Sequence, residues 1–282
     1  MIGYKSFNFN GLKWRFNQGA IVPLSMPHSL EGFSETEAKK LLRRKNSLLV
    51  RWESAFDCES GKEWWHIIKD VPEDLSKLPK KTRYNIRKAE KSFECKRVSL
   101  TQVLEHGYST YLNASSRYET HEKTISQKNF QHAINTLPSE TEFWAAYSKE
   151  SGRMAAFAEN YVSEDACFYL SLWIEPKALK ELVGYMLFHE MNKHYLNDRG
   201  MSYVSDGARS ISHDTNIHDF LISKFKFRKA YANLNVVYSP LVKIVTSSLY
   251  PFKRLIKKMP LNFAKKLHVL LEQERIRRAC KK

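Results

Sequence analysis

A stretch of alternating strand and helix patterns, from Met201 to Tyr238, constrains most strongly what this 282-residue chain can fold into. Apolar residues alternate from Met201 to Ser205 and from Phe227 to Tyr238, and they recur at helical spacing from about Thr215 to Lys224. This pattern predicts a strand, a helix and a second strand. The polar loop from Asp206 to Asp214 joins the first strand to the helix, which is where open α/β sheets bind ligands. We therefore expect a site in this loop.

Three more strands are predicted upstream of this stretch, over Glu142 to Lys149, Arg153 to Val162 and Ala166 to Glu175. Pro176 ends the third of them, and a helix is predicted from Lys180 to Asn197, whose free N-terminal N–H groups suit a pyrophosphate. Strands and helices in this order predict an α+β protein, with a central mixed, mostly antiparallel sheet flanked by helices.

A helix rich in cations is predicted from Leu78 to Phe93. Arg83 and Arg87 are four residues apart and therefore share a face of this helix. Because a planar guanidinium binds phosphate bidentately, this face is expected to meet a CoA pyrophosphate, an RNA backbone or a phosphorylated acceptor. An ordinary solvated helix face is the alternative.

From Leu78 to Tyr238 the sequence resembles the FemAB-like branch of the GNAT acyltransferase superfamily. The resemblance is carried by the motif from Leu78 to Lys91 and by the run from Pro176 through Leu182 to Asp206-Gly207. It implies a GNAT-like fold with three consecutive parts. These are a partial GNAT-like region over residues 1–95, an acyltransferase domain over 96–238 and a basic helical tail over 239–282.

The resemblance also implies a reaction, the transfer of an acyl group from acyl-CoA to an amino group of a cell-envelope or polysaccharide precursor. One alternative is an aminoacyl-tRNA-dependent aminoacyltransferase of peptidoglycan precursors, and another is a non-catalytic protein that binds anions, nucleic acid or membranes on a GNAT scaffold. Direct amine attack needs a base, a donor for the oxyanion and alignment. The candidate bases are Asp206 and His213, with Asp206 acting as a turn cap in the alternative interpretation. The candidate substrate-binding residues are Arg83, Arg87, Arg117, Tyr118, His121, Arg209 and Asn216.

The expected donor site departs from that of acetyl-CoA users, whose phosphate loop is rich in glycine. This chain has only Gly184 in the corresponding segment KALKELVGYM, which leaves aminoacyl-tRNA open as a donor beside acyl-CoA. The proton-donating Tyr of many GNAT enzymes aligns with Ile222, and the Gly that usually ends their last helix aligns with Lys226. The residues expected to line the donor site are Glu175, Leu182, Gly184 and Tyr185.

Charge is concentrated at the C-terminal end of the chain. The formal net charge is +16, and the residues from Lys243 onward hold twelve Lys or Arg against two Glu. Helices are predicted from Leu241 to Tyr250 and from Leu261 to Ala279, and their basic, amphipathic character suits an anionic membrane or RNA. A helical lid packed on the core is the alternative. Together with four scattered cysteines, these features predict a cytoplasmic protein, in peripheral contact with the inner face of the membrane.

A metal site is not expected, although His189, Glu190 and His194 look like a zinc-protease motif. The two histidines are five residues apart, which places them roughly 140° apart around a helix, so they do not share a face.

Overall fold

Two units interleave along the sequence in the computed structural model, which describes residues 4–17, 19–59, 62–116, 124–163, 165–211, 216–257, 259 and 262–280. The first unit contains Ile67–Gly207 and Ile217–Arg228. The second contains Lys5–His66, Ala208–Asn216 and Lys229–Lys282. The consecutive ranges expected from the sequence, 1–95, 96–238 and 239–282, do not coincide with these units.

The strands of the first unit lie in the order β10-β9-β8-β7-β6. They are β6 (Phe93–Val98), β7 (Thr141–Ser148), β8 (Met154–Val162), β9 (Ala166–Ile174) and β10 (Tyr203–Ala208). β9 and β10 are parallel, and the other neighbours in this unit are antiparallel. The predicted meander of three strands is confirmed, and so is the mixed, mostly antiparallel sheet.

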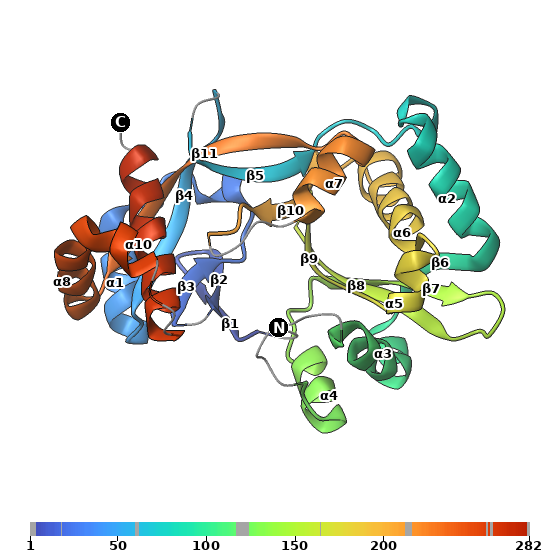
Figure 1. The fold of residues 1–282 in the computed structure, drawn as a ribbon, viewed down its shortest axis with the longest axis horizontal. Helices are drawn as coiled ribbons and strands as arrows, with labels where there is room; N and C mark the ends of the chain where they lie inside the picture. The colour runs from blue at the N-terminus through green and yellow to red at the C-terminus, as the bar shows by residue number, and fades with distance from the viewer. Residues whose placement is uncertain are drawn as a thin grey trace. The chain divides into compact units, whose positions relative to one another are not determined.

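Helices cover both faces of these strands (Figure 1). One face carries α2 (Lys80–Ser92) and α6 (Val183–Asn192), and the other carries α3 (Leu100–Ser115) and α4 (Gln127–Asn135). The inward side of α2 is buried, with Ile86 and Ala89 fully inaccessible. Under α3 and α4 an aromatic cluster forms the core, which includes Phe130 and Phe157.

The helix predicted from Lys180 to Asn197 is observed as α6, which continues without a break into a π-helical segment (Lys193–Asp198). A separate short helix, α5 (Pro176–Lys180), precedes it. The break between α5 and α6 lies at Leu182, whose φ of 71° places it in the left-handed region and ends the helical path. The chain therefore turns once more before α6 begins.

The last helix and strand of the predicted stretch are α7 (Asn216–Phe225) and β11 (Arg228–Tyr238). Between them Lys226 has a φ of 59°, and the N–H of Phe227 donates to the carbonyl of Leu221. A left-handed residue just past the last turn is how helices commonly end at glycine. Lys226 takes the place of that glycine.

The second unit has strands in the order β1-β2-β3-β4-β11. The elements of this unit that precede β5 are β1 (Ser6–Phe9), β2 (Leu12–Asn17), β3 (Ala20–Pro23), η1 (Pro27–Leu30), α1 (Glu35–Lys45) and β4 (Leu49–Cys58). β5 (Trp64–Lys69) contributes its first three residues to this unit and its last three to the first unit. Ser34 and Glu37 form a capping box at the start of α1.

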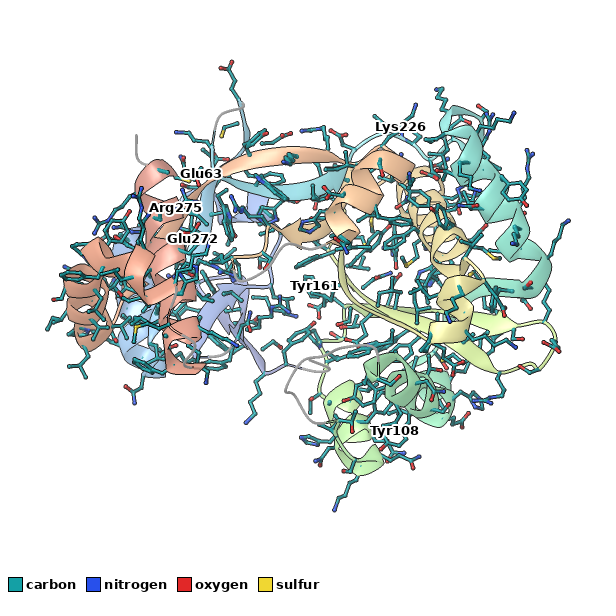
Figure 2. The ribbon with its side chains drawn as sticks, viewed as in Figure 1. Glu63, Tyr108, Tyr161, Lys226, Glu272 and Arg275 are labelled. Carbon is teal, nitrogen blue, oxygen red and sulfur yellow. The ribbon has the colours of Figure 1, made fainter. Side chains whose placement is uncertain are left out.

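The C-terminal helices belong to the second unit. They are α8 (Pro240–Leu249), η4 (Tyr250–Phe252), α9 (Lys253–Lys257) and α10 (Asn262–Cys280). Leu271 and Ile276 of α10 are fully buried, and Arg275 forms ion pairs with Glu63 and Glu272 (Figure 2). α10 is thus a packed lid rather than a free amphipathic helix.

Candidate active site

The parallel pair β9 and β10 separates after only three residue pairs. Its register runs from Tyr203 opposite Ala166 to Ser205 opposite Phe168. Past Phe168, within the described residues, β9 has a ladder partner only on its β8 side. An open strand edge offers backbone donors and acceptors to an extended ligand.

A β-bulge lies next to this separation. Glu159 of β8 pairs with Ser171 of β9 and Asn160 pairs with Tyr169, so Leu170 is the extra residue. A bulge bends its strand and redirects the side chains that follow, and bulges are common beside active sites. We therefore place the candidate active site where β9 bends and leaves β10.

Gly207 explains how close the two strands come before they separate. Its φ is +88°, and a Cβ at this position would lie 2.8 Å from the ring of Phe168. A side chain here would meet both a strained backbone and the ring. Glycine at position 207 is therefore required by the strand geometry.

Glu159 is the main polar group of the candidate active site. It lies two residues after Phe157, whose side chain packs in the core under α3 and α4, so both side chains point to that face of β8. The residue is fully buried, and neither carboxyl oxygen makes a hydrogen bond of good geometry, although the side chains of Trp173 and Ser171 lie close enough to interact with it. Buried carboxyls are ordinarily paired, so this one requires an explanation.

Burial changes the acid–base behaviour of Glu159. Removal of water disfavours the charged carboxylate and raises the pKa of Glu159 to about 7, while Trp173 and Ser171 on β9 lower it in part. A carboxyl with a pKa near 7 is half ionised at neutral pH. It can therefore accept a proton from an ammonium group and release it again.

Asp206 lies on β10 and pairs with His218 of α7, with 3.4 Å between Oδ2 and Nε2. Burial raises the pKa of Asp206, and the hydrogen bond from His218 opposes this effect. The carboxyl also interacts electrostatically with Tyr169, whose hydroxyl donates to Asn192 of α6. Asp206 therefore belongs to the α6 side of the strands, whereas Glu159 belongs to the α3 and α4 side.

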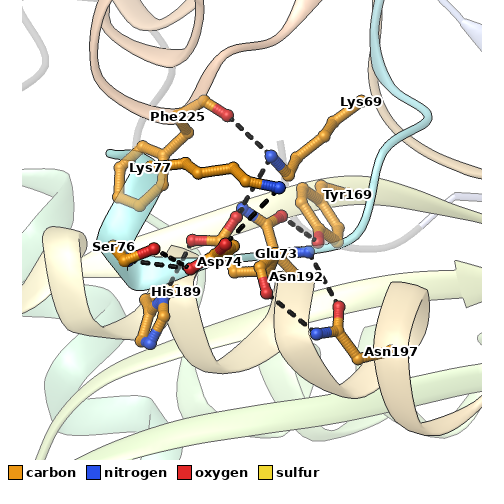
Figure 3. A network of polar contacts seen from close by, with 10 residues as sticks. All are labelled: Lys69, Glu73, Asp74, Ser76, Lys77, Tyr169, His189, Asn192, Asn197 and Phe225. Carbon is orange, nitrogen blue, oxygen red and sulfur yellow. Dashed lines mark hydrogen bonds and ion pairs between the residues drawn. The ribbon is translucent and has the colours of Figure 1, made fainter. Parts of the chain in front are cut away.

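A buried network surrounds Glu73 on the α6 side (Figure 3). Glu73 accepts from Lys69 at 3.2 Å and from Nδ1 of His189 at 2.8 Å, and Lys69 also donates to the carbonyl of Phe225 at 3.0 Å. Asn197 both donates to and accepts from the Glu73 backbone at 2.8 Å. Each charge has partners, which is the arrangement of a structural network.

His189 therefore belongs to this network. No cluster of three or more His, Cys, Asp or Glu side chains suited to a metal occurs among the residues that the structure describes.

The expected donor-site residues lie around the start of α6. Glu175 accepts from Asn113 of α3 at 2.8 Å, and Tyr185 packs edge-on against Phe220 of α7 with 4.9 Å between ring centroids. Leu182 makes the left-handed turn before α6. A Cβ on Gly184 would lie 3.5 Å from Ile174, an ordinary contact, so the backbone there does not depend on glycine.

Of the residues expected to bind substrate, four are described. Arg83 donates to the carbonyl of Ser76 at 2.6 Å, which anchors η2 (Leu75–Lys77), and Arg87 is exposed on α2. Arg209 belongs to the second unit, where it donates to the carbonyl of Glu63 at 2.7 Å. Asn216 is the exposed first residue of α7. The other expected residues, Arg117, Tyr118, His121 and His213, lie outside the described residues.

Sequence reasoning missed Glu159 and His218. The signal for Glu159 was present, because it is the only charged residue in the strand MAAFAENYV, whose other positions suit burial on both faces. The contact between His218 and Asp206 depends on how α7 folds back on β10, and no residue pattern in the sequence predicts this contact.

A hollow of about 170 Å³ lies elsewhere, in the second unit, lined by Phe33, Glu35, Trp52, Ser54, Asn235, Val236 and Arg277. Asn235 donates to Ser54 at 2.8 Å and Arg277 donates to Glu274 at 2.7 Å. These polar groups are already engaged, and none of them combines burial with the lack of a hydrogen bond of good geometry as Glu159 does. We therefore prefer the β8–β9 site.

Solved structures share the fold of this chain although they share little of its sequence. No protein-family model matches this sequence, and a search of curated proteins finds no match. The crystal structure of FemX superposes with a TM-score of 0.55 at 9% identity, over 91% of each chain. L-PGS from Bacillus licheniformis gives a TM-score of 0.50 at 13% identity, over 96% of this chain and 90% of that one.

A third similar structure is the C-terminal domain (DUF2156) from Agrobacterium fabrum, assigned to a lysylphosphatidylglycerol synthetase. It gives a TM-score of 0.51 at 10% identity, over 88% of each chain. Likeness at such identities concerns the fold alone. It confirms the GNAT-like fold of the FemX kind that the two sequence motifs predicted.

Proposed function

We propose that this protein transfers an acyl or aminoacyl group from an activated donor to an amino group of a cell-envelope precursor. The observation that carries the proposal is the buried carboxyl of Glu159, which lies beside the bulge of β9 and makes no hydrogen bond of good geometry. The fold that this chain shares with FemX and L-PGS supports a transferase, and the name of the Agrobacterium relative, which refers to a lipid product, supports an envelope acceptor.

Glu159 acts as the general base in this proposal. The amine attacks the carbonyl carbon of the donor, a C–N bond forms, and the proton of the amine passes to the Glu159 carboxylate. The C–S or C–O bond to the leaving group then breaks, and the leaving thiolate or alkoxide takes up that proton from the Glu159 carboxyl, which returns to the carboxylate. General base catalysis of this kind contributes roughly 10²- to 10⁴-fold to a rate.

The open edge of β9 holds the donor. An extended pantetheine or acyl-ester arm has amide or ester groups that can pair with backbone groups past Phe168. Lys177 and Lys180, both exposed on α5, lie just before the turn into α6 and supply positive charge for phosphates. Acyl-CoA is therefore the first donor to test.

Aminoacyl-tRNA is the second donor, and the start of α6 favours it. α5 occupies the segment where a glycine loop would be, and the N–H groups of Leu182 and Tyr185 already donate to the carbonyls of Leu179 and Leu182. A helix start with these N–H groups occupied offers fewer donors to a pyrophosphate.

Donor binding tests the proposal. The purified protein is titrated with acetyl-CoA, a longer acyl-CoA and a pool of charged tRNA. Saturable binding of one donor is expected, and Lys177→Ala/Lys180→Ala should weaken it about tenfold, since two charge-assisted contacts are lost. Lys39→Ala/Lys40→Ala, which removes two exposed lysines of α1, is the matched control and should bind normally.

Turnover of the bound donor tests the role of Glu159. Glu159→Gln should retain binding and lose at least 100-fold in turnover, whereas Glu150→Gln, in the turn before β8, should behave as wild type. Absence of binding for all three donors would overturn the enzyme proposal. Normal turnover in Glu159→Gln would overturn only the assignment of the base.

A further inference from the structure

The helices between β11 and α10 expose an unusual number of apolar side chains. The structure shows thirteen exposed large hydrophobic residues, and seven of them fall within residues 241–263. They are Leu241, Ile244, Val245, Phe252, Leu255, Met259 and Phe263, with exposed fractions from 41% to 78%. We call these seven residues the apolar face. Exposed apolar residues concentrated in one segment point to a site of interaction.

The apolar face is not required for packing of the second unit. The same helices use a different set of residues for that purpose, since Leu249, Tyr250 and Ile256 pack with Leu267 and Leu271 of α10. On α8 the exposed residues Leu241, Ile244 and Val245 follow helical spacing, which places them on one side. The segment therefore has one apolar side for the core and another for a partner.

Cations and no acids accompany the apolar face. From Ser239 to Leu271 the sequence contains seven Lys or Arg and no Asp or Glu. Those that the structure describes as exposed are Lys243, Arg254, Lys257, Lys265 and Lys266. Apolar side chains flanked by positive charge match a surface that is apolar beneath and negative on top.

We propose that the apolar face inserts into the surface of an anionic lipid bilayer, with the surrounding cations on the lipid headgroups. α8 has ten residues and α9 has five, so neither helix is long enough to cross a bilayer. None of the described helices is long and apolar enough to span a membrane. This attachment is independent of which donor the active site uses.

Two other occupants fit the observations less well. In a dimer the segment from Ser239 to Leu271 of one copy would face the same segment of the other. This segment has cations and no acidic residue, so like charges would repel across the interface. Single-stranded nucleic acid is held by aromatic side chains on which bases stack, but five of the seven exposed residues are aliphatic or Met.

Vesicle sedimentation with the full chain tests the proposal. The protein should pellet with phosphatidylcholine vesicles that contain about a third phosphatidylglycerol and remain in solution with phosphatidylcholine alone. Ile244→Glu/Leu255→Glu should reduce binding at least tenfold, because two charges enter the apolar face. Arg254→Gln/Lys257→Gln should also reduce it about tenfold, and salt should weaken wild-type binding.

The matched control places the same change on exposed apolar residues elsewhere. Val71→Glu/Leu100→Glu should bind vesicles as wild type does, since both residues lie outside the apolar face. Thermal unfolding of every variant shows whether the fold is retained. Failure of wild-type protein to pellet with anionic vesicles would overturn the proposal, and so would equal loss in the control. Gel filtration in which Ile244→Glu/Leu255→Glu dissociates a dimer without changing vesicle binding would overturn it in favour of a second copy.

Discussion

At the scale of single residues, Glu159 connects the stability of the protein to pH. The pKa of its carboxyl is about 7 in the folded protein, above the ordinary value of 4.5, because the site excludes water. Between these two values the folded state binds more protons than the unfolded state. The free energy of unfolding contributed by this residue therefore falls as the pH rises from about 4.5 to 7.

We expect Glu159→Gln to remove this fall in the free energy of unfolding with pH, because the amide has no charge to bury. Relative to wild type, the variant should gain up to about 3 kcal/mol in free energy of unfolding between pH 5 and pH 8. Urea unfolding at the two pH values measures the difference. Glu150→Gln removes a carboxyl that is hydrated in both states, and a gain of equal size in that variant would contradict the explanation.

Lys226 gives a second prediction at this scale. Its left-handed backbone at the end of α7 costs a residue with a side chain about 1 kcal/mol more than it costs glycine. Lys226→Gly should therefore raise the free energy of unfolding by about that amount. Lys224→Gly, two residues earlier and inside α7, should instead lower it by a similar amount, as glycine does in helices. If both changes lower the free energy of unfolding, contacts of the Lys226 side chain stabilise the protein by more than its left-handed backbone costs.

At the scale of elements, the Glu73 network joins β5, the segment before η2, α6 and the π-helical segment. Lys69 is 1% exposed, so its charge depends on Glu73 for compensation. Glu73→Gln should cost about 3 kcal/mol in free energy of unfolding, since a buried ammonium group loses its counter-charge.

The double variant Lys69→Met/Glu73→Leu is the informative comparison for this network. It removes both charges together and should cost less than Glu73→Gln alone. Asp74→Asn changes the neighbouring exposed acid and should have a much smaller effect. Urea unfolding of the three variants distinguishes a charge requirement from general sensitivity of this segment.

Elements were easier to predict from the sequence than the site was. The strands over 142–175 and the helices α2, α3 and α7 follow apolar periodicity, which depends on local burial and was therefore visible. The break at Leu182 depends on one backbone angle of a residue that usually continues a helix. Glu73 and His189 are 116 residues apart, and Asp206 meets His218 across a folded connection, so no local pattern records either pair.

At the scale of the whole molecule, composition does not show which residues of the C-terminal segment are buried and which are exposed. Its basic, leucine-rich last helix suggested a free amphipathic surface, but α10 packs Leu271 and Ile276 into the second unit. The exposed apolar residues lie on the shorter helices before it. Point substitutions on the apolar face therefore test membrane contact more cleanly than deletion of the tail, which would remove part of the core.

The interleaving of the two units sets an order for events during synthesis. Residues 67–207 of the first unit leave the ribosome as one continuous segment and can begin to fold at once. The second unit must wait, because Trp64 is buried in a cluster with Ile276 and Cys280, which are translated more than two hundred residues later. Until then Trp64 lacks the residues that bury it, and it remains available for binding by a chaperone.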